Sequence, residues 1–599
     1  MLPVVLLSWQ TAVGCRTMLT KRQVKTAEET SGTFLPTTGR EMEERGWEEL
    51  DVLLVSGDAY VDHPAFGVSL LGRLLESRGY RVGIVAQPRW NTPEDIARMG
   101  RPRLFCGVSS GCLDSMLAHY TAFRKKRRDD AYTPGGQCGS RPNRAVIVYS
   151  NLVRQAFPGL PVVIGGIESS LRRAAQYDFW SNSLRRSILL DSKADVLVYG
   201  MGERAVLEIA ERIGADRDLD GVRGAATVLG ASAVELPPDA AELPSYEAIE
   251  AEPTALLSAT LRIERQVLQG GPSLVQRHGK RVVCLNPPAE PLTEVEFDAI
   301  YELPFVRDAH PSYKETIPAL DMVRWSITAV RGCAGGCSFC SLALHQGRRI
   351  RSRSKGSILH EVSTMAENGA FRGAISDIGG PTANLWGARC KGETETCHRS
   401  SCLSPAICPH LDVPQGDYLK LLRSVRKQAG VKHVRVASGI RYDLALQCPE
   451  FARGLIAEFV GGQLKLAPEH TVDRVLGLMR KTRFDLFERF LKVFASVNKE
   501  TGREQYIVPY IMSAFPGCTM ADMKALATWF KKQGWRPQQV QCFIPTPGTV
   551  ATAMYYAECD AKGSPIPVAK TDRERQDQHG VLAERRGSGP GRRHRGKRG

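Results

Sequence analysis

The chain has 599 residues, of which 43% are hydrophobic and 24% charged, and its formal net charge is +16. This length is too great for one ordinary hydrophobic core, and the composition excludes a wholly disordered chain. The last 20 residues hold seven Lys or Arg against one Glu, so much of the charge lies in the tail. A solubilising surface with a basic tail explains this charge, and nucleic-acid binding remains an alternative that is not favoured.

The cysteine content indicates a reducing compartment. The chain has 16 cysteines, several of them in tight groups, and clustered cysteines in a long chain bind metal more often than they form disulfides. Because thiolate ligands must stay reduced, we expect a cytoplasmic protein. No run of 18 apolar residues is present, so we predict no membrane span.

After a predicted disordered extension at residues 1–33, the first domain is expected at residues 34–215. Short apolar runs that end in glycine or small polar residues predict buried parallel strands. Such strands alternating with helices predict an α/β fold with a doubly wound, flavodoxin-like sheet, which binds ligands at the carboxyl ends of its strands. The expected strands lie at residues 51–55, 81–86, 104–108, 162–164 and 195–199.

Two groups of polar residues follow strands of this predicted sheet. Both ligand contact and turn or capping chemistry stay open for them. The groups are Asp58, Asp62 and His63, and Glu168, Arg172 and Arg173.

The rest of the chain divides into three parts. Residues 216–318 contain two Pro-Pro pairs and one expected helix at 254–269, and we interpret them as a connecting region. A second α/β domain is expected at residues 319–560. The final part, residues 561–599, becomes rich in Gly and Arg, and a basic low-complexity tail is predicted there.

The second domain begins with a cysteine triad, which comprises Cys333, Cys337 and Cys340. The triad follows a strand-like segment at residues 325–330 and has the spacing C-x3-C-x2-C. A compact loop of this spacing can direct three thiolates at three irons of one cubane cluster, and the neighbouring glycines let the backbone wrap closely. The fourth iron would then be open to another ligand. A zinc knuckle or reduced core thiols are the competing interpretations.

This loop resembles the cluster motif of radical S-adenosylmethionine (SAM) enzymes, including the aromatic Phe339 before the last cysteine. The resemblance implies a 4Fe–4S cluster that cleaves SAM, in a partial (β/α)6, TIM-like barrel. Further residues match the SAM-binding segments of that family. They are Gly379 and Gly380 after the second strand, Ser438 and Arg441 after the fourth, and Glu469 at the end of the fifth.

A second set of cysteines lies in an expected insertion at residues 386–412. This quartet comprises Cys390, Cys397, Cys402 and Cys408, with the spacing C-x6-C-x4-C-x5-C. Three interpretations stay open: an auxiliary zinc ion or second cluster, redox-active or substrate-holding thiols, and local structural thiols. The spacing matches no standard zinc knuckle, so it does not name the metal.

Longer segments narrow the resemblance to the YgiQ-type radical SAM proteins, a family of uncharacterised activity. Among them are the GDAYVDHP run at residues 57–64, GGIESSLRR at 165–173 and PTPGT at 545–549. The resemblance implies an enzyme that generates a 5′-deoxyadenosyl radical with an electron from a reductant such as flavodoxin or ferredoxin. The alternatives are a radical methyl or methylthio transferase acting on RNA or protein, and a metal-binding regulatory module without turnover. The sequence names no substrate.

The N-terminal domain is also similar to the cobalamin-binding domains of other radical SAM enzymes. Those domains that use a histidine ligand carry D-x-H-x-x-G. Here Val61 stands where the Asp is needed for His63, and Gly67 comes one residue late. The sequence therefore favours a degenerate flavodoxin-like domain that shapes substrate access, and cobalamin is not expected.

Overall fold

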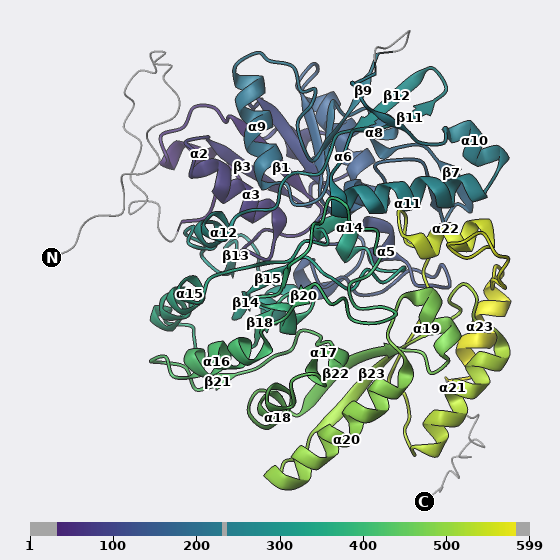
Figure 1. Ribbon diagram of the computed structural model, residues 1–599. Coiled ribbons are helices and arrows are strands. Elements are labelled where there is room, and N and C mark those ends of the chain that lie inside the picture. Colours follow the sequence, from purple (N-terminus) through teal and green to yellow (C-terminus); the bar gives the residue numbers. More distant parts are fainter. Residues whose placement is uncertain (1–32, 231–235, 583–599) are drawn as a thin grey trace, which may run out of the picture.

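The computed structural model describes residues 33–230 and 236–582. Of the predicted extension at residues 1–33, residues 1–32 lie outside this range. In Figure 1 the N-terminal half of the chain, drawn from purple to teal, lies above the C-terminal half, which is drawn from green to yellow. The C-terminal half, from residue 326 onward, is called the core below. Within the described ranges, no helix has the length and apolar character needed to cross a bilayer.

A nine-stranded mixed sheet organises the N-terminal half, in the order β10-β11-β12-β9-β8-β5-β4-β1-β3. The five strands expected from the sequence all form and lie parallel to one another, in the order β3-β1-β4-β5-β8. This is the strand order of flavodoxin-like sheets, which bind ligands where the order reverses, here between β1 and β4. The strands are β1 (Val52–Ser56), β3 (Val82–Ala86), β4 (Phe105–Ser109), β5 (Val162–Gly165) and β8 (Val196–Val198).

Helices cover both faces of this sheet, so its strands are apolar along their whole length. Every residue of β1 is buried, as a parallel strand between two helical layers requires. The two largest hydrophobic clusters of this half lie on opposite sides of the sheet. The principal helices are α3 (Gly67–Glu76), α6 (Ala145–Ala156), α7 (Gly166–Leu171), α8 (Ile188–Ser192) and α9 (Glu203–Gly214).

The expected connecting region is in fact part of the sheet, which corrects the boundary at residue 215. Strand β9 (Ala225–Leu229) pairs antiparallel with β8, and β12 (Arg281–Leu285) pairs with β9. Strands β11 (Leu274–His278) and β10 (Ala241–Glu242) complete the edge. The proline pairs lie between these elements, not in a linker. Helix α11 (Thr254–Gln269) forms where it is expected and packs on the core helix α22 (Val550–Ala557).

The core consists of parallel strands in three separate groups. The pairs are β14 (Ser326–Thr328) with β18 (Asp377–Gly379), β17 (Ala374–Ile375) with β21 (His433–Val434), and β22 (Gln463–Glu469) with β23 (Tyr506–Ser513) and β24 (Gln539–Cys542). A helix follows each successive strand. In chain order these helices are α15 (Lys355–Glu367), α16 (Gln415–Arg426), α18 (Pro449–Glu458), α20 (Phe484–Thr501), α21 (Met520–Lys532) and α22.

This succession corrects the strand count of the sequence-based interpretation. Ser438 and Arg441 follow β21, which belongs to the third parallel strand of the core and not to a fourth. Glu469 ends β22, which is the fourth strand and not the fifth. The sequence-based count agrees with the structure up to Gly379, which ends β18 in the second strand of the core, and it is one too high after that point.

The C-terminal segment is ordered further than expected. Residues 561–582 are predicted from composition to belong to a low-complexity tail, but they include α23 (Asp572–Gly580). Arg575 of this helix is buried, stacks on Phe179 and donates to the carbonyl of Phe543. Buried contacts therefore hold the segment, although its composition is polar. The rest of the predicted tail, residues 583–599, lies outside the described range.

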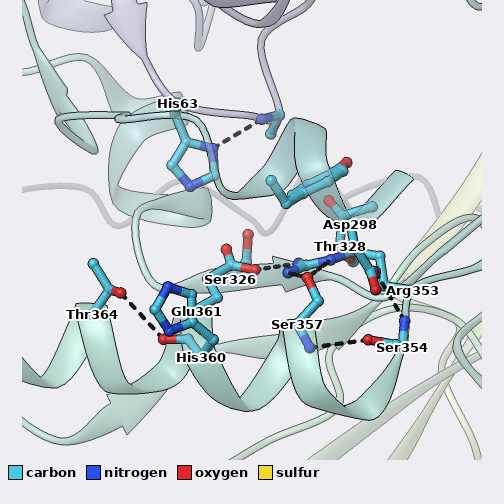
Figure 2. A network of polar contacts seen from close by, with 12 residues as sticks. His63, Asp298, Ser326, Thr328, Arg353, Ser354, Ser357, His360, Glu361 and Thr364 are labelled. Carbon is cyan, nitrogen blue, oxygen red and sulfur yellow. Dashed lines mark hydrogen bonds and ion pairs between the residues drawn. The ribbon is translucent and has the colours of Figure 1, made fainter. Parts of the chain in front are cut away.

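A buried polar junction joins the two halves. His63 lies close to helix α15 of the core, where Arg353 donates to Glu361 and to Ser357 (Figure 2). Arg307 lies between them: it contacts the His63 imidazole at 3.0 Å and forms an ion pair with Glu361. His63 thus has a structural partner.

Candidate functional site

The cysteine triad occupies the loop between β15 (Val330–Arg331) and α14 (Leu342–Gln346). The amide of Cys340 donates to the carbonyl of Cys337 at 3.1 Å, which closes a tight turn. The amide of Gly335 donates to the sulfur of Cys333 at 3.4 Å. A Cβ at Gly335 would lie 3.3 Å from that sulfur and 3.7 Å from the sulfur of Cys337. The thiols of Cys333 and Cys337 therefore both lie beside the backbone of Gly335, which carries no side chain.

Glycine is required at two further positions of this loop. Gly332 and Gly336 have φ angles of +82° and +57°, in the left-handed region that favours glycine. A Cβ would lie 2.5 Å from the carbonyl oxygen of Arg349 at the first position, and 2.1 Å from that of Ser400 at the second. The loop thus lies directly against the cysteine-rich insertion.

Cations compensate the negative charge that thiolates bring to this buried loop. Burial raises the pKa of the Cys337 thiol, and the positive charges of Lys481 and Arg441 oppose that rise. Burial and the other two thiols raise the pKa of Cys340 to about 12. The raised pKa values keep Cys337 and Cys340 neutral without metal, and binding of a metal would displace their protons.

Arg441 and Asp443 form a buried pair beside the triad. Nε of Arg441 donates to the Asp443 carboxylate at 2.9 Å, and its Nη1 would lie 3.7 Å from a Cβ at Gly335. Burial lowers the pKa of Arg441, but Asp443 outweighs this effect and raises it. Glu469 adds a second carboxylate: burial raises its pKa, against the charges of Lys481 and Arg441. Its φ of +67° is unusual for a residue with a side chain.

The Gly379 segment and the Ser438 segment meet at the ends of their strands. A Cβ at Gly379 would lie 2.6 Å from Oγ of Ser438, and one at Gly380 would lie 2.0 Å from the carbonyl oxygen of Val330. Asp377 joins the segments, since it accepts hydrogen bonds from the amides of Ala437 and Ser438 at 2.8 and 3.0 Å. Close packing thus accounts for both glycines.

Phe339 differs from the other expected residues, because its contacts are apolar. Its ring packs edge-to-face on Phe515, with centroids 6.2 Å apart, at the margin of the main core cluster. It helps to fix the triad loop on the core.

Sequence reasoning did not select three residues of this site. Asp377, Asp443 and Lys481 all lie among the expected residues, and Asp443 and Lys481 are buried. Asp377 lies two residues before Gly379, and Asp443 lies two residues after Arg441. A carboxylate so close to a predicted SAM-binding residue is the sequence signal that could have identified both. Lys481 follows α19 (Asp473–Met479), and no motif marks it.

The donor set suits an iron–sulfur cluster. Among residues 33–230 and 236–582, no three His, Cys, Asp or Glu side chains are gathered closely enough to hold a single metal ion. A cubane cluster does not need such convergence, because each cysteine binds a different iron. The bare backbone at Gly335 and the nearby cations fit such a group.

The cysteine quartet lies next to the triad. The amide of Cys402 donates to the carbonyl of Ala334 at 3.0 Å, and the amide of Cys408 donates to the carbonyl of Cys402 at 2.7 Å. Strands β19 (Arg389–Cys390) and β20 (Leu411–Asp412) close the insertion into a hairpin. The structure thus brings the two cysteine sets together.

A cavity of about 690 Å³ opens between the N-terminal sheet and the triad loop. The sheet contributes the carboxyl ends of its parallel strands, among them Ser109 and Gly165, and the core contributes Leu342, His345 and Pro381. This volume is in the range of small-molecule and cofactor sites. Of the polar residues singled out in this domain, only Asp58 lines the cavity, and it is paired with Arg141 at 3.0 Å.

The other polar residues that the sequence analysis singled out in the N-terminal domain have partners within the protein. Asp62 pairs with Arg73, and Glu168 accepts from the amide of Ser115 at 2.8 Å. Arg172 pairs with Asp114, and Arg173 stacks on the ring of Tyr199. For these residues the structure favours the capping and packing interpretation.

The fold and site together define an enzyme of the radical SAM class. A family model described as "Radical SAM N-terminal" matches residues 34–326. The solved structure of the radical SAM methyltransferase TsrM from Kitasatospora setae, with cobalamin and a 4Fe–4S cluster bound, has a similar fold. Its TM-score is 0.50 at 16% identity, over 88% of this chain and 84% of that one.

The chain belongs to the UPF0313 family. A UPF0313 protein of Geobacter sulfurreducens is 51% identical over 558 residues, which is 92% of each chain. One of Methanosarcina acetivorans is 45% identical over 580 residues, covering 92% of this chain and 78% of the relative. This family agrees with the resemblance seen in the sequence.

The comparison does not support the expectation that cobalamin is absent. That expectation depended on the missing histidine motif, and the solved neighbour with the same fold holds cobalamin. The absent motif therefore gives no ground to exclude a corrinoid.

Proposed function

We propose that this protein holds a 4Fe–4S cluster at the triad and cleaves SAM reductively to generate a 5′-deoxyadenosyl radical. The observation that carries the proposal is the convergence of charged groups of both signs on the triad loop. Nη1 of Arg441 would lie 3.7 Å from a Cβ at Gly335, beside the sulfurs of Cys333 and Cys337, and the charges of Lys481 and Glu469 also affect the pKa of Cys337. SAM carries an amino group, a carboxylate and a sulfonium, so it needs partners of both signs.

The roles of individual residues follow from this arrangement. Asp443 fixes the Arg441 guanidinium, which would then face the SAM carboxylate. Glu469 and the Asp377–Ser438 pair offer oxygen atoms to the amino group and the ribose. Gly379 and Gly380 let their strand end pack closely against Ser438 and Val330, which fixes the Asp377–Ser438 pair in place. Phe339 and its apolar neighbours keep water from the loop.

The test is an anaerobic assay of 5′-deoxyadenosine formation with dithionite and SAM. We expect product from the reconstituted protein and none from the Cys333→Ala/Cys337→Ala/Cys340→Ala variant. Cys448→Ala is the matched control, because this partly buried cysteine belongs to neither set. Equal product from the triple variant would overturn the assignment.

The cavity supports a second candidate function, methyl transfer through a corrinoid. It opens at the carboxyl edge of a doubly wound sheet and reaches Leu342, two residues after Cys340. The solved neighbour of similar fold is a methyltransferase with cobalamin bound. A corrinoid at this edge would lie between the sheet and the SAM site.

Binding of hydroxocobalamin, followed by its absorption spectrum, tests this candidate. Ala65 is exposed and lines the cavity, so Ala65→Trp is expected to weaken binding at least tenfold by occupying space, while Ala65→Ser is not. Iron content at the triad should be the same in both variants. If the wild-type protein does not bind the corrinoid, this second function is excluded.

A further inference from the structure

The fold of the insertion links cysteines of the quartet through backbone contacts, although their side chains do not converge on a single point. Cys390 pairs with Leu411 across the hairpin, and the amide of Leu411 donates to the carbonyl of Cys408 at 3.0 Å. Burial raises the pKa of the Cys402 thiol, Arg348 opposes the rise, and the other three thiols of the quartet raise it further. Backbone contacts link three of the four residues directly, because the amide of Cys408 donates to the carbonyl of Cys402 at 2.7 Å and Leu411 joins Cys408 to Cys390.

A buried cation faces this group of thiols. Arg348 is only 5% exposed. Its Nη1 donates to the carbonyl of Arg399 at 2.8 Å, its Nη2 lies 3.8 Å from the sulfur of Cys402, and its Nε has no hydrogen-bond partner. No carboxylate of the described residues forms an ion pair with Arg348. A buried charge without a counter-charge is costly, and a metal centre bound by thiolates is negative and would supply one.

The quartet also lies between solvent and the triad. Cys390 is exposed. At the other end, the amide of Cys402 reaches Ala334, next to Cys333, and the hydroxyl of Ser401 donates to the carbonyl of Gly335. Leu403 shares a small hydrophobic cluster with Val330 and Ala334. Arg348 bridges the two sets, because it also lines a small cavity with Cys337 and Cys340.

We propose that the quartet binds a second iron–sulfur cluster, which passes electrons from a protein donor to the triad. This inference depends on the proposed function, since it supplies the electron that SAM cleavage consumes. One electron leaves a reduced flavodoxin- or ferredoxin-type donor and reduces the quartet cluster by one electron. The quartet cluster then passes that electron to the triad cluster and is reoxidised. No covalent bond forms or breaks in these steps, and no proton moves.

The chemistry of the site favours a cluster over zinc. The quartet spacings of six, four and five residues lie mostly outside the two to four residues typical of paired zinc ligands. Zinc also has no redox chemistry, so it could not use the position between solvent and the triad. Four thiolates are a complete ligand set for a 4Fe–4S cluster.

The first experiment counts metal in the full chain after anaerobic reconstitution. Iron, zinc and acid-labile sulfide are measured per chain, with electron paramagnetic resonance after dithionite. We expect about eight irons in the wild type and in the Cys448→Ser control, and about four in the triad triple variant. The Cys397→Ser/Cys402→Ser/Cys408→Ser variant is also expected to keep about four. A triad variant without iron, or with one zinc, would overturn the cluster.

A second variant does not depend on removing ligands. In the triad-less protein, Arg348→Gln should lower the midpoint potential of the remaining cluster, because a positive charge that stabilises its reduced form is lost. Arg351→Gln is the control, since Nη1 of this neighbouring side chain donates to the carbonyl of Ile350 and, among the described residues, no hydrogen bond or ion pair joins it to the quartet. An unchanged potential in Arg348→Gln would contradict the placement of the cluster at Cys402.

The last experiment tests electron transfer. The rate of 5′-deoxyadenosine formation is measured with reduced flavodoxin and with dithionite, and the ratio of the two rates is compared. The quartet variant should have a ratio at least tenfold below that of the wild type. An unchanged ratio would refute the electron-transfer role. Failure of SAM cleavage in every protein would refute the proposed function instead, and the iron counts would still decide the cluster.

Discussion

The two cysteine sets lie against each other but have different surroundings. The triad has three thiols, with Arg441 and Lys481 as cations and Asp443 and Glu469 as carboxylates. The quartet has four thiols and one buried cation, Arg348. Mixed charges beside an incomplete ligand set suit a site that takes up a further charged molecule. A complete ligand set with one counter-charge suits a centre that only holds metal.

The buried Arg441–Asp443 pair offers the strongest test of this difference. Asp443→Asn should lower the free energy of unfolding by about 3–5 kcal/mol, because it leaves the Arg441 charge buried without its partner. Denaturant titration of the metal-free chain measures the loss. Asp417→Asn breaks the exposed pair with Lys420 and should cost far less, because solvent screens that pair. Equal losses of unfolding free energy in the two variants would show that the Arg441 charge beside the triad does not depend on Asp443 for compensation.

The contact between the two sets can be broken at Gly336. A Cβ there would lie 2.1 Å from the carbonyl oxygen of Ser400, and the φ of +57° adds strain. Gly336→Ala should cost about 1–3 kcal/mol and reduce SAM cleavage driven by flavodoxin more than cleavage driven by dithionite. Gly439→Ala is the control, since a Cβ at that position would have no neighbouring atom within 4 Å. Equal loss with both reductants would indicate that the contact only supports the fold.

The smallest effect is expected from the pH dependence of Glu469. Burial raises the pKa of the Glu469 carboxyl above its ordinary pKa, which is the one it has in the unfolded chain. At a pH between these two pKa values, the folded chain therefore holds a proton that the unfolded chain has released. Stability conferred by this residue is therefore present below its ordinary pKa and is lost as pH rises through the folded value. Glu469→Gln should be relatively more stable at pH 7 than at pH 4, with weaker SAM binding.

Urea titrations at several pH values check this expectation. The difference in unfolding free energy between Glu469→Gln and wild type should grow with pH and then level off. A difference that stays constant with pH would contradict the buried carboxyl.

The sequence by itself determined the local features of this protein. The apolar runs of β1, β3, β4, β5 and β8 were recognisable because strands covered on both faces are apolar throughout. The spacing of the triad and its glycines was equally local. The mixed edge of the sheet was not recognisable, because the paired residues of β9 and β12 lie 53 to 59 positions apart in the sequence, from Leu229 with Val282 to Ala226 with Leu285.

Only the tertiary structure decided which charges surround each cysteine set. Lys481 reaches the triad from beyond α19, and Arg348 reaches Cys402 across more than 50 residues. Such pairings depend on how strand ends and loops pack, and no periodicity or spacing encodes them. Helix α23 also depends on tertiary contacts. Its sequence is polar, and the buried contacts of Arg575 with Phe179 and Phe543 hold it against the rest of the protein.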